Sequence, residues 1–401
     1  MPVSKTHPWI TFHIDLHRVP FTLWMMLGEA QSKCEHLAGE PLQPDLDHDL
    51  HSLYLAKGVH ATTAIEGNTL TEKQVQQRIQ GKLELPPSQE YMGKEIDNIL
   101  TACSGILAEL MGEGATDLST EEIKRFNSMA LEGLELGEEV APGSIRNIMV
   151  GVARYRAVPP QHMDTLLEKL CIWLNDNKFK QSKNKIALGI FRAILAHLYI
   201  AWIHPFADGN GRTARLMEFK ILLSHGVPSA AAHLLSNHYN QTRTEYYRQL
   251  DVASKSKGDV IPFITYAVQG FIDGLKEQLT LVQAQQLNII WRDYVYSKFK
   301  NKYGTANERR RKLALDISEC NEPVALKDIA MLTPRLASLY ANKTYRTVVR
   351  DVVELISMGL LVRKANQYRP RWEVIKGFLP ICIPSLSDSG ANERNCIAEE
   401  D

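Results

Sequence analysis

Twelve consecutive residues, at positions 204–215, combine an imidazole, a carboxylate and two guanidinium groups around a glycine-rich turn; their sequence is HPFADGNGRTAR. Glycine and asparagine tolerate positive φ, so the Gly-Asn-Gly at 209–211 favours a turn whose N–H groups point inward. A helix that begins at about Gly211 would add the positive end of its dipole to those N–H groups. The segment therefore predicts a cradle for an anion.

The charged side chains of the segment fit such a cradle. Arg212 and Arg215 are three residues apart and would lie on nearly one face of the following helix. His204 stands at the entrance of the cradle, and Asp208 is placed to hold a cation.

The segment resembles the signature of the Fic family, H-P-F-x-[DE]-G-N-G-R-x-x-R, and matches it at every specified position. A lone histidine at a helix end is more often structural, whereas a complete match favours a functional role for His204. Fic proteins mostly transfer AMP from ATP to a Ser, Thr or Tyr hydroxyl of a target protein. The resemblance therefore implies an enzyme, a protein adenylyltransferase that modifies a target protein and itself.

The resemblance also implies how protons and metal are handled. His204 would take the proton from the attacking hydroxyl, as an imidazole with a pKa near neutrality can do. Asp208 would hold Mg²⁺ between the α- and β-phosphates, because carboxylate oxygens suit this hard cation. His197 lies two helical turns upstream, about 10 Å along the helix axis, and is expected to be structural.

By the same resemblance, the remaining residues of the signature bind ATP. The α-phosphate is expected on Asn210 and on the N–H groups of Gly209 and Gly211. Arg212 would contact the β-phosphate and Arg215 the γ-phosphate, each through a two-pronged guanidinium. Contacts of this kind do not identify the base, so transfer of UMP or of a phosphate group stays open as an alternative.

Two tyrosines further along the chain are candidates for nucleotide binding. Tyr246 and Tyr247 resemble the pair that lines the adenine pocket in the family, and an aromatic face is a suitable platform for a purine. The family often has Asn seven residues after the pair, where this sequence has Ser254. Ordinary packing is the alternative role for either tyrosine.

A second family signature precedes the cradle. Residues 62–68, TTAIEGN, match [S/T]-x-x-x-E-[G/N], which marks an inhibitory helix, expected at about residues 50–67. In the family its glutamate pairs with the second arginine of the cradle and blocks the γ-phosphate; in this chain the pair would be Glu66 and Arg215. The alternative is that Glu-Gly-Asn only ends a helix. Whether the same glutamate also assists removal of AMP stays open.

Between the two signatures lies the one strand-like segment of the first 300 residues. Pro142-Gly143 marks a turn, and the β-branched and aromatic residues that follow predict a β-hairpin over 143–158. The hairpin fits the flap with which Fic proteins hold the target, by addition of a strand to an exposed edge. A plain hairpin on a helical domain is the alternative.

Helical periodicity elsewhere predicts a mainly α fold: a Fic helical bundle with a small β-hairpin flap, followed by a winged helix-turn-helix-like domain. We expect four regions. They are an N-terminal helical region at 1–110, a catalytic core at 111–280, the winged-helix-like domain at 281–384 and a disordered tail at 385–401.

The expected winged-helix-like domain has a short helix at 324–332, a longer helix at 342–358 and a strand at 372–375. The longer helix carries three basic residues: Lys343, Arg346 and Arg350. Such a helix is typical of DNA recognition. The alternative is that the charges form a solvated face and that the domain packs on the core or forms a homodimer. A nucleotide-sensing regulator that binds DNA is therefore the alternative to an enzyme.

The bulk composition is that of an ordinary globular protein. Lys plus Arg equals Asp plus Glu at 46 each, so the net charge favours no polyanionic partner. The six cysteines are scattered without a C-x-x-C spacing, which favours reduced thiols in a cytoplasmic protein. We find no signal-peptide pattern and no apolar run of 18 residues, so no membrane span is expected.

Overall fold

The computed structural model describes residues 6–40, 44–112, 114, 117–152, 155–179, 183–256, 258–320 and 322–376. The chain divides into two compact units, residues 1–282 and 283–401, and each has its own hydrophobic core. The mainly helical fold predicted from the sequence is confirmed. The expected tail at 385–401 lies outside the described residues.

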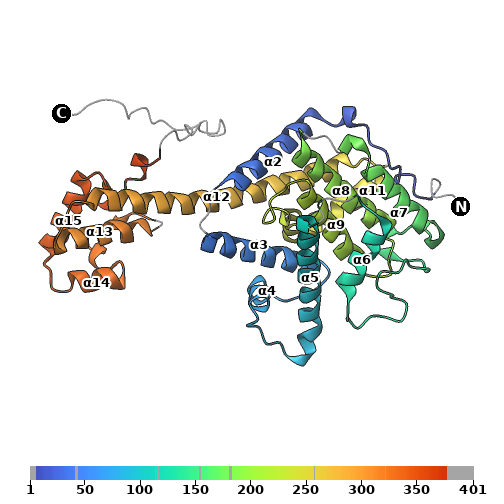
Figure 1. Cartoon of the computed structure of the whole chain (residues 1–401), viewed down its shortest axis with the longest axis horizontal. Coiled ribbons are helices and arrows are strands. Elements are labelled where there is room, and N and C mark those ends of the chain that lie inside the picture. The colour runs from blue at the N-terminus through green and yellow to red at the C-terminus, as the bar shows by residue number, and fades with distance from the viewer. Residues whose placement is uncertain are drawn as a thin grey trace. The chain divides into compact units, whose positions relative to one another are not determined.

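The first unit is a bundle of helices, coloured blue to yellow in Figure 1. Their bounds are α2 Phe21–Gly39, α3 Pro44–Ala64, α4 Glu72–Ile79, α5 Glu90–Gly112, α6 Thr120–Leu131, α7 Met163–Leu174, α8 Lys185–Ile203, α9 Asn210–Ser224, α10 Leu234–Gln241 and α11 Arg243–Lys255. The long helix α12, Ile261–Phe299, begins in this unit and continues into the second.

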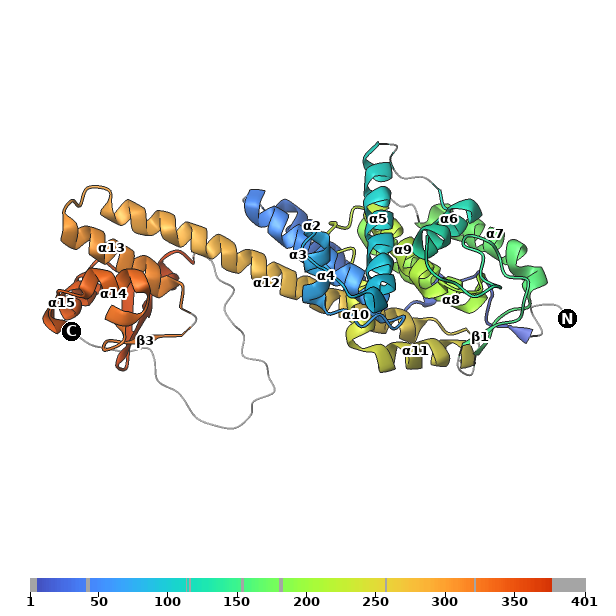
Figure 2. The ribbon, with the colours of Figure 1, turned by 90° about the horizontal axis from the view of Figure 1, so that it is seen from below.

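Helix α8 forms the centre of the first unit, where Figure 2 shows it beside α9. It is apolar nearly all round, so burial on every side is its most favourable environment. Among the described residues it is the one helix long and apolar enough to cross a membrane, but 89% of that stretch is buried inside the protein. Helices α2 and α7 pack on it together with α9.

Two helical segments extend beyond the sequence prediction. Helix α10 was not expected, because its eight residues are mostly polar and lack an apolar repeat. Helix α12 is continuous to Phe299, across residue 281, where we expected a new region to begin. No glycine or proline interrupts the chain between Gly274 and Gly304, so nothing in that stretch opposes the helix.

Helix α3 carries the predicted brake and packs closely against α10. A Cβ atom added at Gly58 would lie 2.1 Å from the Nδ1 atom of His233, which is buried. The absence of a side chain at Gly58 therefore allows the close approach of the two helices. After α3 the chain turns through Gly67 and enters α4 through the capping box that Thr71 and Gln74 form.

The hairpin predicted over 143–158 is present but much shorter. The strands β1 Gly151–Val152 and β2 Tyr155–Arg156 pair in antiparallel register, and one further bond joins the Ala157 N–H to the carbonyl of Val150 at 3.2 Å. The preceding residues are held differently, because the Arg146 guanidinium donates to the carbonyls of Ile148 and Val158 at 2.6 and 2.5 Å. A side chain thus satisfies carbonyl groups that a longer strand pair would have used.

The second unit combines three further helices with a small sheet. Its elements are α13 Thr305–Ser318, α14 Pro334–Tyr340, α15 Tyr345–Ser357, β3 Val324–Ala325, β4 Leu361–Lys364 and β5 Gln367–Pro370. The sheet is antiparallel with strand order β3-β5-β4. The winged-helix interpretation of this unit stays a prediction.

Two local predictions in the second unit are wrong. The segment 324–332 is not a helix but strand β3 followed by a 3-10 turn at Ile329–Met331. The helix begins later, where Thr333 caps the N-terminus and Pro334 occupies the first turn. The expected strand at 372–375 is a 3-10 turn, Trp372–Val374, that follows the real strand pair.

Replacing Gly58 by alanine should destabilise the first unit. The new methyl group would overlap the His233 ring, and overpacking of this kind costs about 1–3 kcal/mol. Thermal or urea unfolding would measure the loss. Gly28→Ala is the matched control, because Gly28 lies within α2, is exposed and has open space where the methyl group would go. A Gly58→Ala protein as stable as wild type would contradict this packing.

Candidate active site

The predicted cradle connects the two central helices of the first unit. Helix α8 ends at Ile203, and His204 caps it in a left-handed conformation with φ of 52°. The His204 N–H bonds the carbonyl of Ile200 at 2.8 Å. Gly209, with φ of 77°, then starts α9, so the helix begins at Asn210, slightly earlier than predicted. Within the Gly-Asn-Gly turn only Gly209 has a positive φ.

Two asparagines fix the shape of this loop. The Asn210 amide donates to the carbonyl of Phe206 at 2.8 Å and accepts from the Phe206 N–H at 2.9 Å. Asn127 on α6 donates to the carbonyl of Asp208 at 2.9 Å and accepts from the N–H of Gly143. In this state the Asn210 side chain braces the loop, while Asn127 ties the loop to the segment that leads to the hairpin.

Arg146 supports the loop from the other side. Its backbone N–H donates to the carbonyl of Pro205 at 3.0 Å, and its Nε donates to the carbonyl of His204 at 2.7 Å. The side chain is buried, and burial lowers the pKa of its guanidinium. Sequence reasoning missed both Arg146 and Asn127. Each lies within one of the segments we predicted, but no sequence pattern identifies a backbone carbonyl as its partner.

The predicted pair of Glu66 and Arg215 is formed. The Nη2 atom of Arg215 lies 2.6 Å from Oε1 of Glu66 and also donates to the carbonyl of Thr62 at 2.9 Å. The Arg215 side chain is 1% exposed and that of Glu66 is 32% exposed. Burial alone would raise the pKa of Glu66, but the Arg215 guanidinium outweighs burial and holds it below its ordinary value.

The rest of the Arg215 guanidinium is free of protein partners. Its Nε and Nη1 atoms are buried without a hydrogen bond, although the whole side chain lies in the interior. Gly211 leaves room beside it, since a Cβ at Gly211 would be 2.1 Å from the Glu66 carboxylate and 3.1 Å from Nη1 of Arg215. Two unpaired donors next to a side-chain-free helix start suit an incoming anion.

Arg212 is held by two carboxylates. Its Nη1 donates to Glu95 on α5 at 2.9 Å, and its Nη2 lies 3.3 Å from Asp208. The other oxygen of Glu95 accepts from Asn68 at 2.9 Å. The turn that carries Glu66 therefore reaches both arginines of the cradle, directly at Arg215 and through Asn68 and Glu95 at Arg212.

Asp208 is more exposed than Glu66 and Glu95, the other carboxylates that contact the arginines, with a side chain that is 48% exposed. One oxygen accepts from the N–H of Gly209 at 2.5 Å. In the described part of the chain no cluster of three or more His, Cys, Asp or Glu residues could hold a metal. A single carboxylate with open space is nevertheless sufficient for Mg²⁺, which commonly binds one or two carboxylates together with substrate phosphates.

His204 is the imidazole of the cradle, four residues before Asp208. Burial lowers the pKa of its imidazole to about 4, and the nearby positive charge of Arg146 acts in the same direction. Glu66 and Asp208 oppose the shift. The pKa near neutrality expected from the sequence is thus wrong, because burial disfavours the charged ring. The ring is neutral at physiological pH, and a neutral imidazole has a nitrogen lone pair that can accept a proton.

The two candidate tyrosines occupy different environments. Tyr246 is 3% exposed, and its hydroxyl lies 2.8 Å from Nε2 of His197. It therefore packs in the interior of the first unit. Tyr247 is 42% exposed, and its hydroxyl reaches the carbonyl of Ile65 in the brake turn at 3.5 Å. Of the pair, Tyr247 has the exposed aromatic face that a purine could contact.

His197 has the structural position expected from the sequence. It is fully buried, with Nε2 on Tyr246 and Nδ1 3.4 Å from a carboxylate oxygen of Glu218. The other oxygen of Glu218 accepts from Tyr239 at 3.0 Å. These buried polar groups join α8, α9, α10 and α11, the helices around the cradle.

Comparison with known proteins is consistent with this geometry. Protein adenylyltransferase fic-1 of Caenorhabditis elegans is 28% identical over 258 residues, which are 62% of this chain and 47% of that protein. Protein adenylyltransferase Fic of Nematostella vectensis is 28% identical over 211 residues, which are 53% and 45% of the two chains. The chain thus spans about half the length of the curated relatives that it matches.

Solved structures share the fold. Fic-1 from C. elegans superposes with a TM-score of 0.54 at 26% identity, covering 66% of this chain and 74% of that one. A Fic family protein from Desulfovibrio desulfuricans gives a TM-score of 0.55 over 89% of this chain and 98% of that one, at 20% identity. Residues 117–222, which run from just before α6 into α9, match the Fic/DOC family. The chain therefore contains a segment that is similar to the Fic/DOC family.

Proposed function

We propose that this protein is an adenylyltransferase that transfers AMP from ATP to a Ser, Thr or Tyr hydroxyl of a target protein and of itself. One observation carries the proposal: a complete cradle whose buried Arg215 is paired with Glu66. Two relatives that are named protein adenylyltransferases support the same activity, and the match covers about half the length of each.

In the proposed reaction His204 is the general base. The neutral imidazole accepts the proton of the attacking hydroxyl, whose oxygen bonds to the α-phosphorus while the bond to the β-phosphate oxygen breaks and pyrophosphate leaves. The proton stays on His204 until it is released to solvent. Arg212 and Arg215 hold the leaving phosphates, so positioning and electrostatic stabilisation supply most of the catalysis. Mg²⁺, bound at Asp208, would neutralise charge on the phosphates.

The proposed resting state is an inhibited one. Glu66 and a γ-phosphate compete for one guanidinium, and the short Glu66–Arg215 contact favours the carboxylate while the turn after α3 stays in place. The buried Nε and Nη1 of Arg215 remain available to a phosphate once Glu66 has moved away. Inhibition and substrate binding thus involve the same side chain.

The β1–β2 hairpin is the proposed docking site for the target. Its ends are anchored to the catalytic helices, because the Tyr155 hydroxyl donates to the carbonyl of Trp202 at 2.6 Å. An extended segment of the target would add to one edge of the hairpin and lie beside His204. Such pairing uses backbone groups, so the sequence of the target would matter little.

A second candidate function, DNA binding, is favoured by the surface of α15. Lys343, Arg346 and Arg350 are exposed on or just before this helix. Two basic residues of α13 form ion pairs within the unit and are not available to DNA, since Arg309 and Arg310 bond the buried Asp351 at 2.7 and 2.8 Å. A homodimer and a cytoplasmic location stay predictions from the sequence.

Replacing Glu66 by glycine should raise self-modification by about tenfold or more, because a competing contact worth about 1.4 kcal/mol corresponds to a factor of ten. Incorporation of label from α-³²P-ATP, with mass spectrometry to identify an added AMP, measures the effect. Thr69→Gly is the matched control, since it gives the same loop extra freedom without touching Arg215. Equal labelling of wild type and Glu66→Gly would contradict the brake, and an added UMP or phosphate mass would contradict the proposed donor.

His204→Ala in the Glu66→Gly background provides the catalytic control for that experiment. Labelling should disappear while ATP still binds, as measured by calorimetry, because the arginines and the loop N–H groups remain. Loss of ATP binding together with labelling would instead assign His204 a structural role.

The imidazole of His204 should titrate with a midpoint of about 4. Its ordinary pKa is 6.5, so the unfolded chain takes up this proton first when the solution is acidified. The fold therefore loses stability as the pH falls from 6.5 toward 4, and the base stays neutral above that range. Two-dimensional NMR of histidine side chains, with His204→Ala for assignment, measures the midpoint. A value near 6.5 would contradict the lowering of the His204 pKa by burial.

If α15 binds DNA, the double variant Arg346→Ala/Arg350→Ala should weaken binding of a duplex. The slope of log affinity against log salt should fall by about 1 for each phosphate contact removed. Fluorescence anisotropy at several salt concentrations measures both quantities. Lys255→Ala, an exposed lysine of the first unit, is the control. Absence of binding by wild type at low salt would refute this function.

A further inference from the structure

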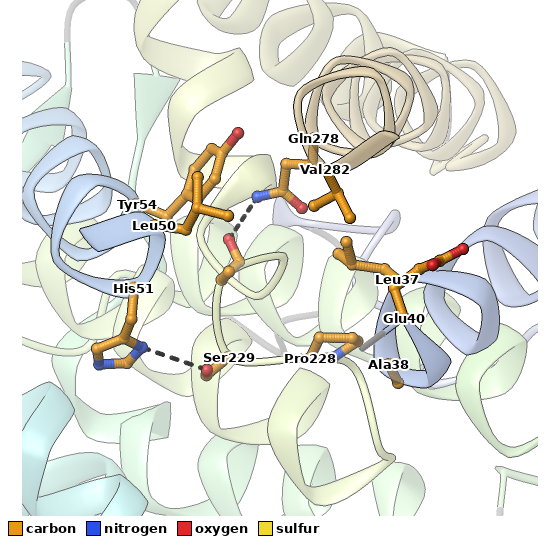
Figure 3. Close-up of a pocket in the computed structure, with 11 residues that line it drawn as sticks. Leu37, Ala38, Glu40, Leu50, His51, Tyr54, Pro228, Ser229, Gln278 and Val282 are labelled. Carbon is orange, nitrogen blue, oxygen red and sulfur yellow. Dashed lines mark hydrogen bonds between the residues drawn. The ribbon is translucent and has the colours of Figure 1, made fainter. Parts of the chain in front are cut away.

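A cavity of about 450 Å³ lies beside the first half of α3, away from the cradle. Figure 3 shows the side chains that surround it, which come from the end of α2, from α3, from the loop before α10 and from α12. Leu37, Leu50, Pro228 and Val282 provide apolar walls. This volume is within the range of small-molecule pockets.

One buried polar atom at the cavity has no partner. Gln278 on α12 is 1% exposed, and its Nε2 donates to the carbonyl of Ala230 at 2.8 Å. Its Oε1 is buried without any hydrogen bond. An unpaired amide oxygen in the interior costs free energy, so each such atom in a folded protein calls for an explanation. A ligand that donates a hydrogen bond to it would remove this cost.

The other polar groups at the cavity indicate the charge of such a ligand. Glu40, whose carboxylate also pairs with His36, lines it, and none of the described lysines and arginines does. Tyr54 also lines it; burial raises the pKa of its phenol to about 12, and the negative charge of Glu277 adds to the shift. The Nδ1 of His51 is 3.5 Å from the hydroxyl of Ser229, which leaves that pair loosely joined. Acceptors and negative charge with apolar walls suit a small organic ammonium ion.

The cavity and the brake belong to the same helix. Leu50, His51 and Tyr54 lie in the first half of α3, and the chain reaches Glu66 just after the helix ends. Between the cavity residues and Glu66, Gly58 is in close contact with His233, so the middle of α3 is tightly packed. A change in how the first half packs is therefore transmitted along a continuous helix to the turn that carries Glu66.

We propose that this cavity is an effector site for a small organic ammonium ion. The bound ion keeps α3 packed in its observed position and so keeps Glu66 paired with Arg215. The cavity has its observed shape while the Glu66–Arg215 pair is formed. A ligand that fits this shape binds the inhibited state better and shifts the population toward it. The regulatory part of this inference rests on the proposed adenylyltransferase activity, whereas binding to the cavity does not.

The binding experiment uses phenethylammonium, whose ring matches the apolar walls and whose ammonium group can donate to Gln278. Calorimetry or saturation-transfer NMR with the full-length protein should detect binding. Phenylpropionate, an anion of similar size, should bind much more weakly. Gln278→Met should weaken binding, whereas Gln269→Met, at an exposed position of the same helix, should not. No binding by wild type, or equal binding of the anion, would overturn the site.

A second variant tests the same cavity independently, in case Gln278→Met does not fold. Leu50→Trp places a ring in the cavity, so it should abolish binding while the unfolding temperature stays at or above that of wild type. If Leu50→Trp binds phenethylammonium as wild type does, the ligand lies elsewhere and the proposed site is wrong.

The coupling experiment measures self-modification with and without phenethylammonium. The ligand should slow the wild type by about fivefold, the lower range of ordinary coupling between sites. It should leave Glu66→Gly unaffected, because that variant has no brake to hold in place. Equal slowing of both proteins would mean competition at the cradle and would overturn the coupling. If neither protein labels at all, the proposed activity fails, while the binding result still decides the site.

Discussion

The fold of the first unit depends on how the positive charge of Arg215 is accommodated in the interior. A guanidinium with almost no exposure requires an anion beside it, since an unpaired buried charge costs several kcal/mol. The Glu66 carboxylate meets this requirement, and it raises the pKa of Arg215 although burial alone would lower it. The interaction that we propose to inhibit the enzyme therefore also stabilises the buried charge of Arg215.

Much of the site is already arranged for a ligand before one arrives. Arg146, Asn127 and Asn210 satisfy backbone carbonyls and N–H groups around the loop, so its shape does not depend on a bound phosphate. His204 is held in a left-handed conformation at the end of α8, the most deeply buried helix. Catalysis by positioning requires rigid supports of this kind.

The sequence allowed some of these features to be predicted and not others. The capping box at Thr71 and the buried α8 follow from local patterns, and the Glu66–Arg215 pair follows from two signatures taken together. Arg146 and Asn127 could not be found in this way, because their partners are backbone carbonyls 58 and 81 residues along the chain. The segment 324–332 was misassigned because a short apolar run fits a helix and a strand equally well, and the cap at Thr333 was overlooked.

Gly211 has a consequence for how such a protein can diverge. Its backbone is not in the left-handed region, so an ordinary L-residue could adopt it, yet a methyl group there would collide with the Glu66 carboxylate. A side chain at this position would therefore push the Glu66 carboxylate away from Arg215 and disfavour the closed state. In a relative without the Glu66–Arg215 contact, this reason to keep glycine at position 211 would be absent. The first turn of α9 could then carry a side chain, unless the bound nucleotide occupies the same space.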